Sequence, residues 1–300
     1  MKVLLTGATG FVGKNISSIL AREHSVVPIG SNVWDLTNQA SCQRMLEQIQ
    51  PDTIVHAAGS VGGIGANQNN PGKFMYENLI MGANLIHCAM EHKIGKFILL
   101  GTVCSYPKFT EIPFKESDMW KGYPEETNAP YGIAKKTLMK LLETYYEQYG
   151  LCGVNLVPVN MYGPQDHFND TTSHVIPALM VKINQAKISN TPIRVWGTGQ
   201  ASREFLYVQD LGEAINLAIK ADLTPEPINI GTGDEIRIYD LVTMLCEIME
   251  FDGEVIYQTD KPDGQPRRCL DTTTAKKLLG FEATTKLRDG LEKTVEWYWG

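Results

Sequence analysis

The sequence contains no long apolar stretch. None of its apolar runs approaches the roughly 18 residues that a membrane-spanning helix needs, and the run Val3–Leu5 in MKVLLTGATG ends at once at Thr6-Gly7. A secretory signal peptide has an apolar core of roughly 7–15 residues. We therefore expect no membrane partner and interpret the first residues as a β-strand.

Cysteine is sparse. The chain has six cysteines in 300 residues, and none of them forms a CxxC pair. A zinc site or a disulfide framework is therefore not expected, and the pattern fits a reducing cytoplasm. We accordingly predict a cytoplasmic protein without a metal centre. The cysteines are Cys42, Cys88, Cys104, Cys152, Cys246 and Cys269.

Positive charge is in the minority. The 27 lysines and arginines face 34 aspartates and glutamates, which gives a net charge of -7. This balance argues against nonspecific binding to nucleic acid or to an anionic membrane, but it allows a local basic pocket for a phosphorylated ligand. The hydrophobic content of 43% and the charged content of 20% are ordinary for a globular protein with a real core.

Internal repeats and low-complexity tracts are also missing, and short apolar runs instead alternate with longer helical patterns. Such alternation predicts an α/β fold, a Rossmann-type doubly wound parallel sheet with helices on both faces. The predicted strands of the first half are Lys2–Leu5, Ser25–Ile29, Thr53–His56, Lys96–Leu100 and Gly153–Val159. The predicted helices between them are Phe11–Arg22, Gln39–Ile49, Lys73–His92 and Tyr131–Tyr149.

Beyond about residue 165 the loops lengthen and the strands shorten. We expect a dinucleotide-binding domain over residues 1–165 and a smaller α/β substrate lobe over residues 166–300, with later segments returning to the first domain. The predicted strands are Ile193–Trp196 and Pro227–Ile230. The predicted helices are His174–Ala186, Asp210–Ala221, Ile238–Met249 and Arg288–Tyr298.

A glycine-rich turn, GATGFVG, directly follows the first predicted strand and opens a helix. Its GxxGxxG spacing is a variant of the dinucleotide fingerprint, in which glycines let the backbone turn tightly and approach a pyrophosphate at a helix N-terminus. The alternative is a turn that serves packing only. The residues expected to contact the cofactor are Gly7, Thr9, Gly10, Phe11, Val12 and Gly13.

A carboxylate is lacking where NAD-binding chains place one, about 20 residues further on at the end of the second strand. The sequence there reads Gly30-Ser31-Asn32. Without a carboxylate the site tolerates a 2′-phosphate, which favours NADP(H). Because no arginine stands there to bind that phosphate, NAD(H) stays open. We expect Asp35 and Leu36 to contact the adenine.

Tyr131 and Lys135 form a YxxxK pair, which shares one face of a helix. A lysine cation beside a phenol stabilises the phenolate and would lower its pKa from about 10. Such a tyrosine can donate a proton to a carbonyl oxygen while hydride arrives at the carbon. The hydroxyl of Thr102, just after the strand Lys96–Leu100, strengthens this interpretation against that of a merely solvated helix face.

The glycine turn, Thr102 and the YxxxK pair resemble the extended short-chain dehydrogenase/reductase family. The sequence His56-Ala57-Ala58-Gly59 after the third strand and Asn78 on the following helix fit that family too. The resemblance thus implies further cofactor contacts at Ala57, Ala58, Gly59 and Asn78.

Further motifs are similar to one branch of this family, which epimerises and reduces GDP-4-keto-6-deoxymannose to GDP-L-fucose. The resemblance runs nearly from end to end. The motifs are VGGIGAN, LGTVCSYPK, ETNAPYGIAKK, NMYGPQDHF, SHVIPALM, VWGTG, REFLYVQDL and KPDGQPRRCLD.

This resemblance implies a role for individual residues and a homodimer built from the helices Lys73–His92 and Tyr131–Tyr149. The implied reductase triad is Thr102, Tyr131 and Lys135, and the implied epimerase acid/base pair is Cys104 and His174. The residues implied to face the GDP-sugar are Asn160, Lys182, Trp196 and Arg203. The chain departs from the family at Thr102, often serine, and at Thr9 and Ser31-Asn32, where arginines are common.

The chemistry of a 4-keto sugar gives these residues a task. The C4 ketone acidifies the C–H bonds at C3 and C5, and a thiol and an imidazole can hold or release the proton near neutrality. Val103-Cys104 stands where a related dehydratase has an Asp-Glu pair, which argues against water elimination. Three alternatives remain: another GDP-4-keto sugar such as a heptose, a plain 4-ketoreductase in which Cys104 only packs and His174 only caps a helix, and a non-catalytic dinucleotide-sensing protein.

Overall fold

The computed structural model describes residues 1–169, 173–261 and 263–300. Its central feature is a six-stranded sheet in which every neighbouring pair of strands is parallel. In sheet order the strands are β2 (Ser25–Ile29), β1 (Lys2–Thr6), β3 (Thr53–His56), β4 (Lys96–Leu100), β5 (Gly153–Pro158) and β9 (Pro227–Ile230). The chain leaves β1 first to one side and then to the other, so the strand order reverses there, and the prediction of a doubly wound Rossmann-type sheet is confirmed.

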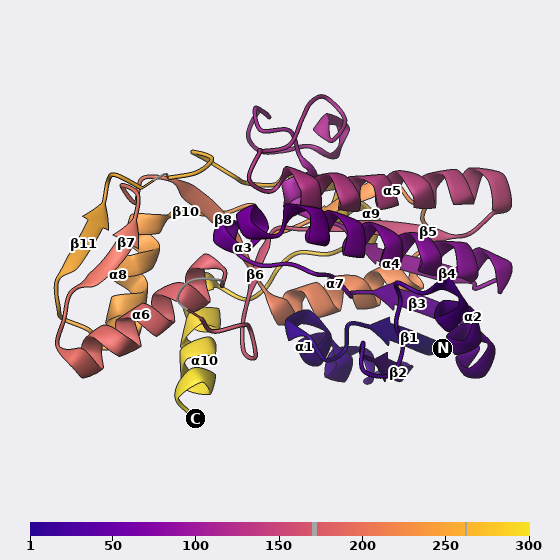
Figure 1. Ribbon diagram of the computed structural model, residues 1–300, viewed down its shortest axis with the longest axis horizontal. Coiled ribbons are helices and arrows are strands. Elements are labelled where there is room, and N and C mark those ends of the chain that lie inside the picture. Colours follow the sequence, from indigo (N-terminus) through magenta and orange to yellow (C-terminus); the bar gives the residue numbers. More distant parts are fainter. Residues whose placement is uncertain (170–172, 262) are drawn as a thin grey trace.

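Helices cover both faces of this sheet (Figure 1). One face carries α2 (Gln39–Ile49), α4 (Pro71–Glu91) and α5 (Ala129–Tyr149), and the other carries α1 (Phe11–Leu20), α7 (Val208–Lys220) and α9 (Thr273–Leu279). Because both faces are buried, the strands are continuous apolar runs rather than alternating ones, as in FILL of β4.

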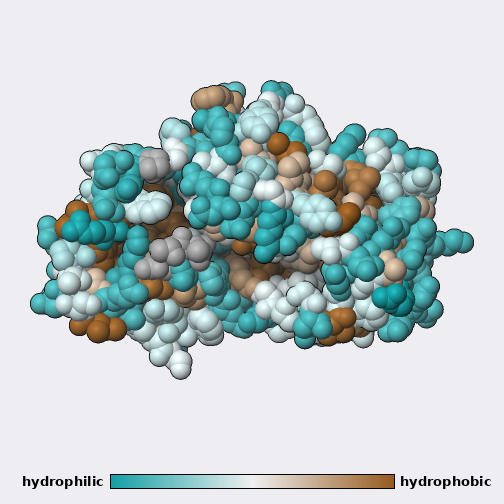
Figure 2. Space-filling view, viewed as in Figure 1, coloured by the Kyte–Doolittle hydropathy of each residue, from teal (hydrophilic) through white to brown (hydrophobic). Residues whose placement is uncertain are grey.

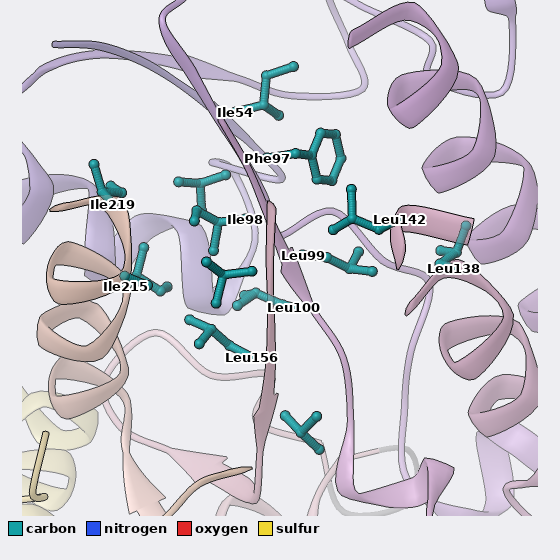
Figure 3. Close-up of a cluster of buried hydrophobic side chains, with 14 of the residues drawn as sticks. Ile54, Phe97, Ile98, Leu99, Leu100, Leu138, Leu142, Leu156, Ile215 and Ile219 are labelled. Atoms are coloured by element: carbon teal, nitrogen blue, oxygen red, sulfur yellow. The ribbon is translucent and has the colours of Figure 1, made fainter. Parts of the chain in front are cut away.

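The core of the sheet therefore has two halves. In Figure 3, Ile98 and Leu100 of β4 point toward Ile215 and Ile219 of α7, while Phe97 and Leu99 point to the opposite side, toward Leu138 and Leu142 of α5. Successive strand residues face opposite sides, and all four β4 side chains are buried.

A second group of elements has its own buried apolar cluster (Figure 1, the end with β7 and β11). Its strands are β6 (Asn160–Tyr162), β8 (Ser202–Tyr207) and β10 (Glu235–Arg237) in one sheet and β7 (Ile193–Trp196) and β11 (Val255–Gln258) in another. Its helices are α6 (Val175–Ser189), α8 (Ile238–Ile248) and α10 (Leu287–Trp299). On the face drawn in Figure 2 the surface is mostly hydrophilic, with hydrophobic side chains in recesses between the elements.

The elements that were predicted lie close to their predicted bounds, but several others were missed. The helix expected to begin at His174 begins at Val175, and the one expected to begin at Asp210 begins at Val208. The unpredicted elements are β6, β8, β10, β11, α9 and α3 (Ile64–Asn69). The strand β8 shows why: its sequence, SREFLY, places charged residues inside a strand that is held by partners far away in the chain.

Two kinds of feature are absent from the described residues. Within residues 1–169, 173–261 and 263–300, none of the helices is long and apolar enough to cross a membrane. In the same residues, three or more His, Cys, Asp or Glu side chains nowhere group in a way that could hold a metal ion.

The two-sided core gives a stability prediction. Ile98 is fully buried, so Ile98→Ala removes packed methyl groups and leaves a cavity, and we expect a loss of about 2–5 kcal/mol in the free energy of unfolding by urea titration. The matched control is Ile188→Ala, because Ile188 is 79% exposed, and its effect should stay within about 0.5 kcal/mol. Equal losses in the two variants would contradict the assignment of the core.

Candidate active site

The glycine turn joins β1 to α1 and has no room for a side chain at Gly7 or Gly13. Gly7 has a φ of +67°, and a Cβ on it would lie 2.7 Å from the backbone of Ala58. A Cβ on Gly13 would lie 2.3 Å from the carbonyl oxygen of Gly7. In the described chain, α1 begins after Gly10, and no side-chain hydrogen bond caps this helix N-terminus. The turn thus offers free backbone N–H groups at a positive helix end, which suits a pyrophosphate.

The segment after β3 forms the neighbouring wall. The Ala58 N–H donates to the hydroxyl of Thr6 at 3.2 Å. Asn78, on α4, accepts from the Ser60 N–H at 3.2 Å and donates to the Ser60 carbonyl at 2.7 Å. A Cβ on Gly59 would meet the Asn78 amide oxygen at 3.0 Å. Asn78 therefore fixes the shape of the Ala57–Ser60 backbone beside the glycine turn.

The end of β2 lies against the same turn. A Cβ on Gly30 would lie 2.7 Å from the Thr9 side chain and 2.9 Å from the amide oxygen of Asn32, so a hydroxyl and an amide gather there. The exposed Asp35 carboxylate accepts from the hydroxyl and the N–H of Thr37, and these hydrogen bonds lower its pKa. Leu36, by contrast, is buried in the core, where its carbonyl accepts from an amide of α4.

The residues of the predicted triad lie where α5 packs on the turn after β4. Thr102 begins the 3₁₀ turn Val103–Ser105, and its hydroxyl accepts from the Cys104 N–H at 3.2 Å. A Cβ on Gly132 would lie 2.3 Å from the Cys104 carbonyl oxygen, so only glycine lets α5 approach this closely. The Ser105 hydroxyl donates to the Gly132 carbonyl at 3.0 Å. This docking puts Tyr131 beside Thr102.

Burial dominates the electrostatics of Tyr131 and Lys135. Burial raises the pKa of Tyr131, a nearby Cys104 thiolate raises it further, and the hydrogen bond with Thr102 lowers it in part. The Lys135 ammonium donates to the carbonyl of Leu100 at 3.1 Å, and burial lowers its pKa to about 8. We expected Lys135 to lower the pKa of Tyr131, but desolvation prevails and the phenol is held in its protonated form.

Cys104 is half-buried and has a side-chain partner from a distant part of the chain. The guanidinium of Arg268 donates to the Cys104 Sγ through Nη1 at 3.7 Å. Arg268 is 8% exposed and arrives from the segment before α9, far away in the chain. The only signal in the sequence is the Arg-Arg pair in the PRRCLD motif.

His174 lies at the N-terminus of α6, as the residue that precedes the first turn. Its ring is open to solvent but has protein on most sides, and this desolvation, followed by the charge of His167, lowers its pKa. Its side chain makes no capping hydrogen bond within the described residues. Among the described residues, the structure shows no hydrogen bond between Cys104 and His174. Two groups that act on opposite faces of a sugar do not need one.

The four residues implied to face the sugar nucleotide lie on β6, α6, β7 and β8. The Asn160 amide donates to the Glu204 carbonyl at 3.1 Å. The Lys182 ammonium donates to the Arg194 carbonyl at 3.1 Å and lies 5.9 Å from the ring centre of Trp196, which is 55% exposed.

Arg203 is a half-buried cation on β8. Its guanidinium donates to the carbonyls of Ser202 at 2.7 Å and Asp263 at 3.3 Å. Burial, then the charge of Arg268, lowers the pKa of Arg203 to about 10. Two guanidinium groups that repel one another are stabilised by an anion between or beside them, and a diphosphate has that charge and geometry.

A doubly wound sheet, a glycine turn at the first βα junction and a Thr–Tyr–Lys cluster at the carboxyl ends of the strands define a nucleotide-cofactor-dependent α/β enzyme. The model of the NAD dependent epimerase/dehydratase family matches residues 3–231, and the chain belongs to this family.

Similarity to known proteins extends over the whole chain. The chain is 37% identical over 297 residues to the GDP-L-fucose synthase of Sinorhizobium fredii, covering 98% of this chain and 94% of that protein. The crystal structure of a GDP-L-fucose synthetase from Naegleria fowleri bound to NADP is similar with a TM-score of 0.91 at 27% identity, covering 99% and 94%. A GDP-mannoheptose C4 reductase from Campylobacter jejuni with NADP bound has a TM-score of 0.90 at 26% identity, covering 100% and 98%.

The lowered pKa of Lys135 makes stability depend on pH. The folded protein binds the lysine proton less tightly than the unfolded chain, whose lysine has a pKa near 10.4. Between about pH 8 and pH 10 the unfolded chain holds more protons, so rising pH favours the folded state. We expect wild type to gain stability relative to Lys135→Met across that window in urea titrations.

The control for this measurement is Lys140→Met. Lys140 is exposed on the same helix, and its hydrogen bond to Glu143 raises its pKa instead. Its difference from wild type should stay flat between pH 8 and pH 10. A flat difference for Lys135→Met as well would show that the buried ammonium is not destabilised.

Proposed function

We propose that the chain is an NADP(H)-dependent 3,5-epimerase/4-reductase that converts GDP-4-keto-6-deoxymannose to GDP-L-fucose. The observation that carries this proposal is the 3₁₀ turn Val103–Ser105, which puts a hydroxyl and a thiol beside the phenol of Tyr131. The similarity over nearly the full chain to the GDP-L-fucose synthase of Sinorhizobium fredii supports the same substrate. The free cysteines, Cys42 and Cys88 included, fit a cytoplasmic enzyme.

The residues around the glycine turn fit a nicotinamide dinucleotide. The uncapped start of α1 at Gly10 would hold the pyrophosphate, and the Ala57–Ser60 backbone lies next to it. Thr9 and Asn32 would offer neutral donors to a ribose 2′-phosphate, without a carboxylate between them. The solved relatives that contain NADP favour this cofactor over NAD. When bound, it supplies the hydride.

In the reduction, Tyr131 acts as the acid. Its raised pKa keeps the phenol protonated, so it can donate to the C4 oxygen as hydride arrives at C4. Thr102 hydrogen-bonds the phenol and orients it. Lys135, held by the Leu100 carbonyl, adds positive charge at the end of β4. The ketone disappears in this step, so reduction must follow epimerisation.

In the epimerisation, Cys104 and His174 move protons at C3 and C5. A base takes the proton from carbon, the electron pair moves into the C4 ketone to form an enolate, and an acid returns a proton on the other face. Tyr131 and Thr102 would hydrogen-bond the enolate oxygen. The lowered pKa of His174 keeps its imidazole neutral at pH 7, with one nitrogen that accepts and one that donates a proton.

The second group of elements would bind the nucleotide sugar. We assign residues 1–165 to a dinucleotide-binding domain and 166–300 mainly to this lobe, with β9, α7 and α9 packed on the large sheet. Arg203 supplies charge for the diphosphate, and the exposed ring of Trp196 offers a flat apolar surface. Asn160 and Lys182 complete the proposed sugar-facing set.

A second candidate is 4-ketoreduction of a GDP-heptose. The structural similarity to the Campylobacter jejuni GDP-mannoheptose C4 reductase favours it. Tyr131, Lys135 and Thr102 serve this reaction equally well, because both substrates present a C4 ketone. The two candidates differ in whether Cys104 and His174 act on carbon.

A single incubation in D2O separates these functions. We expect the purified protein with GDP-4-keto-6-deoxymannose and NADPH to give GDP-L-fucose with deuterium at C3 and C5 in the proton spectrum. Tyr131→Phe should slow NADPH oxidation by about 10²–10⁴-fold while deuterium still enters the keto sugar. Cys104→Ser should block the exchange.

The same incubation can also contradict the proposed function. Reduction without deuterium at carbon would make the protein a plain 4-ketoreductase and leave Cys104 a packing residue. No turnover of this sugar, combined with reduction of a GDP-4-keto-heptose, would favour the second candidate.

The outer faces of α4 and α5 support a homodimer. These two helices pack side by side (Figure 1) and carry the exposed apolar residues Met75, Tyr76, Tyr146 and Tyr149. Two copies that pair these helices would bury the residues in a four-helix bundle. Because the faces are not covered in one chain, pairing would remove apolar surface from water.

The dimer is tested by charge insertion. We expect Tyr76→Glu with Tyr146→Glu to convert a dimer into a monomer in light scattering coupled to gel filtration, because four buried carboxylates would repel and be desolvated. Ile188→Glu, on the exposed side of α6, is the control and should leave the mass unchanged. A wild type that elutes as a monomer would refute the homodimer.

A further inference from the structure

Arg268 is held by backbone pairing on both sides of its chain segment. On one side, the N–H of Ser202 donates to the Pro266 carbonyl at 2.9 Å and the N–H of Glu204 donates to the Arg268 carbonyl at 3.2 Å. On the other side, the N–H of Phe114 donates to the Cys269 carbonyl at 2.8 Å. The segment therefore lies between β8 and the loop after β4, and the position of Arg268 is set by both.

A buried carboxylate anchors the same segment. Glu204 is fully buried and accepts from the N–H groups of Leu270 at 2.7 Å, Thr232 at 2.6 Å and Gly233 at 2.8 Å. Burial raises the pKa of Glu204, and these hydrogen bonds lower it in part. Three backbone donors on one carboxylate fix the turn after β9 against the residues that follow Arg268.

The two neighbouring arginines have opposite environments. Arg267 is exposed and forms an ion pair with Glu235, whose carboxylate accepts from its Nε at 2.9 Å. Arg268 points inward, where its Nε and Nη2 donate to the amide oxygen of Gln265 at 3.2 and 2.9 Å. Its Nη1 donates to the Cys104 Sγ at 3.7 Å. The Arg268 guanidinium thus lies beside a thiol, with a neutral amide to orient it.

We propose that Arg268 is a positioning residue for Cys104, whose guanidinium orients the Sγ atom and stabilises its thiolate form. A guanidinium donor within hydrogen-bonding distance of sulfur favours the anion, which is the form that takes a proton from carbon. This inference rests on the proposed function in one respect, the use of Cys104 in proton transfer. The contact itself does not depend on that function.

Three groups interact with Cys104: Arg268, Arg203 and Tyr131. Arg203 lies close enough for the charges of Arg268 and of a Cys104 thiolate to act on its pKa. A Cys104 thiolate also raises the pKa of Tyr131. Two cations thus favour the thiolate, and the thiolate in turn keeps the phenol protonated. Through Cys104, Arg268 thereby also affects Tyr131, the acid of the reduction step.

The test is the pH profile of thiol alkylation in the full-length protein without substrate. Iodoacetamide reacts with thiolates, and peptide mass spectrometry reads Cys104 separately from the half-buried Cys152 in the same sample. We expect Arg268→Gln to slow the alkylation of Cys104 at pH 7 about tenfold and to move the profile to higher pH. Arg268→Lys should retain part of the rate, and Arg267→Gln should match wild type.

A milder variant covers the case in which Arg268→Gln does not fold. Gln265→Ala leaves the guanidinium in place but removes the oxygen that orients it, so the alkylation of Cys104 should slow in the same direction by a smaller factor. The proposal is overturned if the Cys104 profile is the same in wild type, Arg268→Gln and Gln265→Ala. It is also overturned if wild-type Cys104 reacts no faster than Cys152 at pH 7.

Substrate turnover distinguishes this role from phosphate binding. We expect Arg268→Gln to lower kcat for deuterium exchange at C3 and C5, with the exchange recovering as the pH rises. A higher KM for the GDP-sugar with an unchanged alkylation profile would make Arg268 a substrate-binding residue instead and overturn the proposal. If wild type shows no exchange, the proposed function fails, while the alkylation profile still decides the role of Arg268.

Discussion

The site depends on the close approach of α5 to the turn after β4, which is possible because Gly132 has no side chain. A Cβ there would lie 2.3 Å from the carbonyl oxygen of Cys104, so any other residue would push α5 away from the turn after β4. The Ser105 hydroxyl closes the same contact by donating to the Gly132 carbonyl. Because Tyr131 precedes Gly132, this one approach sets the distance between the phenol and both the Thr102 hydroxyl and the Cys104 thiol.

The parts of the site that are local in sequence were predictable, and so was the sheet. Alternating strands and helices predicted the parallel order, because buried strands of this kind are continuous apolar runs. The spacing of Tyr131 and Lys135 predicted a shared helix face. The sign of the electrostatic effect on Tyr131 was predicted wrongly, since the degree of burial depends on the whole fold and pair spacing does not report it.

The contacts that cross the chain could not be predicted. Arg268 reaches Cys104 across 164 positions, through a segment that pairs with β8 and with Phe114. The strand β8 itself gives a weak signal, because Arg203 and the buried Glu204 interrupt its apolar pattern. Glu204 is tolerated inside because three backbone N–H groups bind its carboxylate, and those donors come from two distant turns.

The charges of the site form a consistent set. Burial keeps the phenol of Tyr131 protonated and the imidazole of His174 neutral, which are the forms that donate to an oxygen and exchange protons at carbon. The Arg268 guanidinium lies 3.7 Å from the Cys104 Sγ, and the role proposed for it is to favour the thiolate form of that sulfur. With that role, one pocket would hold a neutral acid and an anionic base at the same time, because burial keeps the phenol protonated while the sulfur has a guanidinium in contact with it.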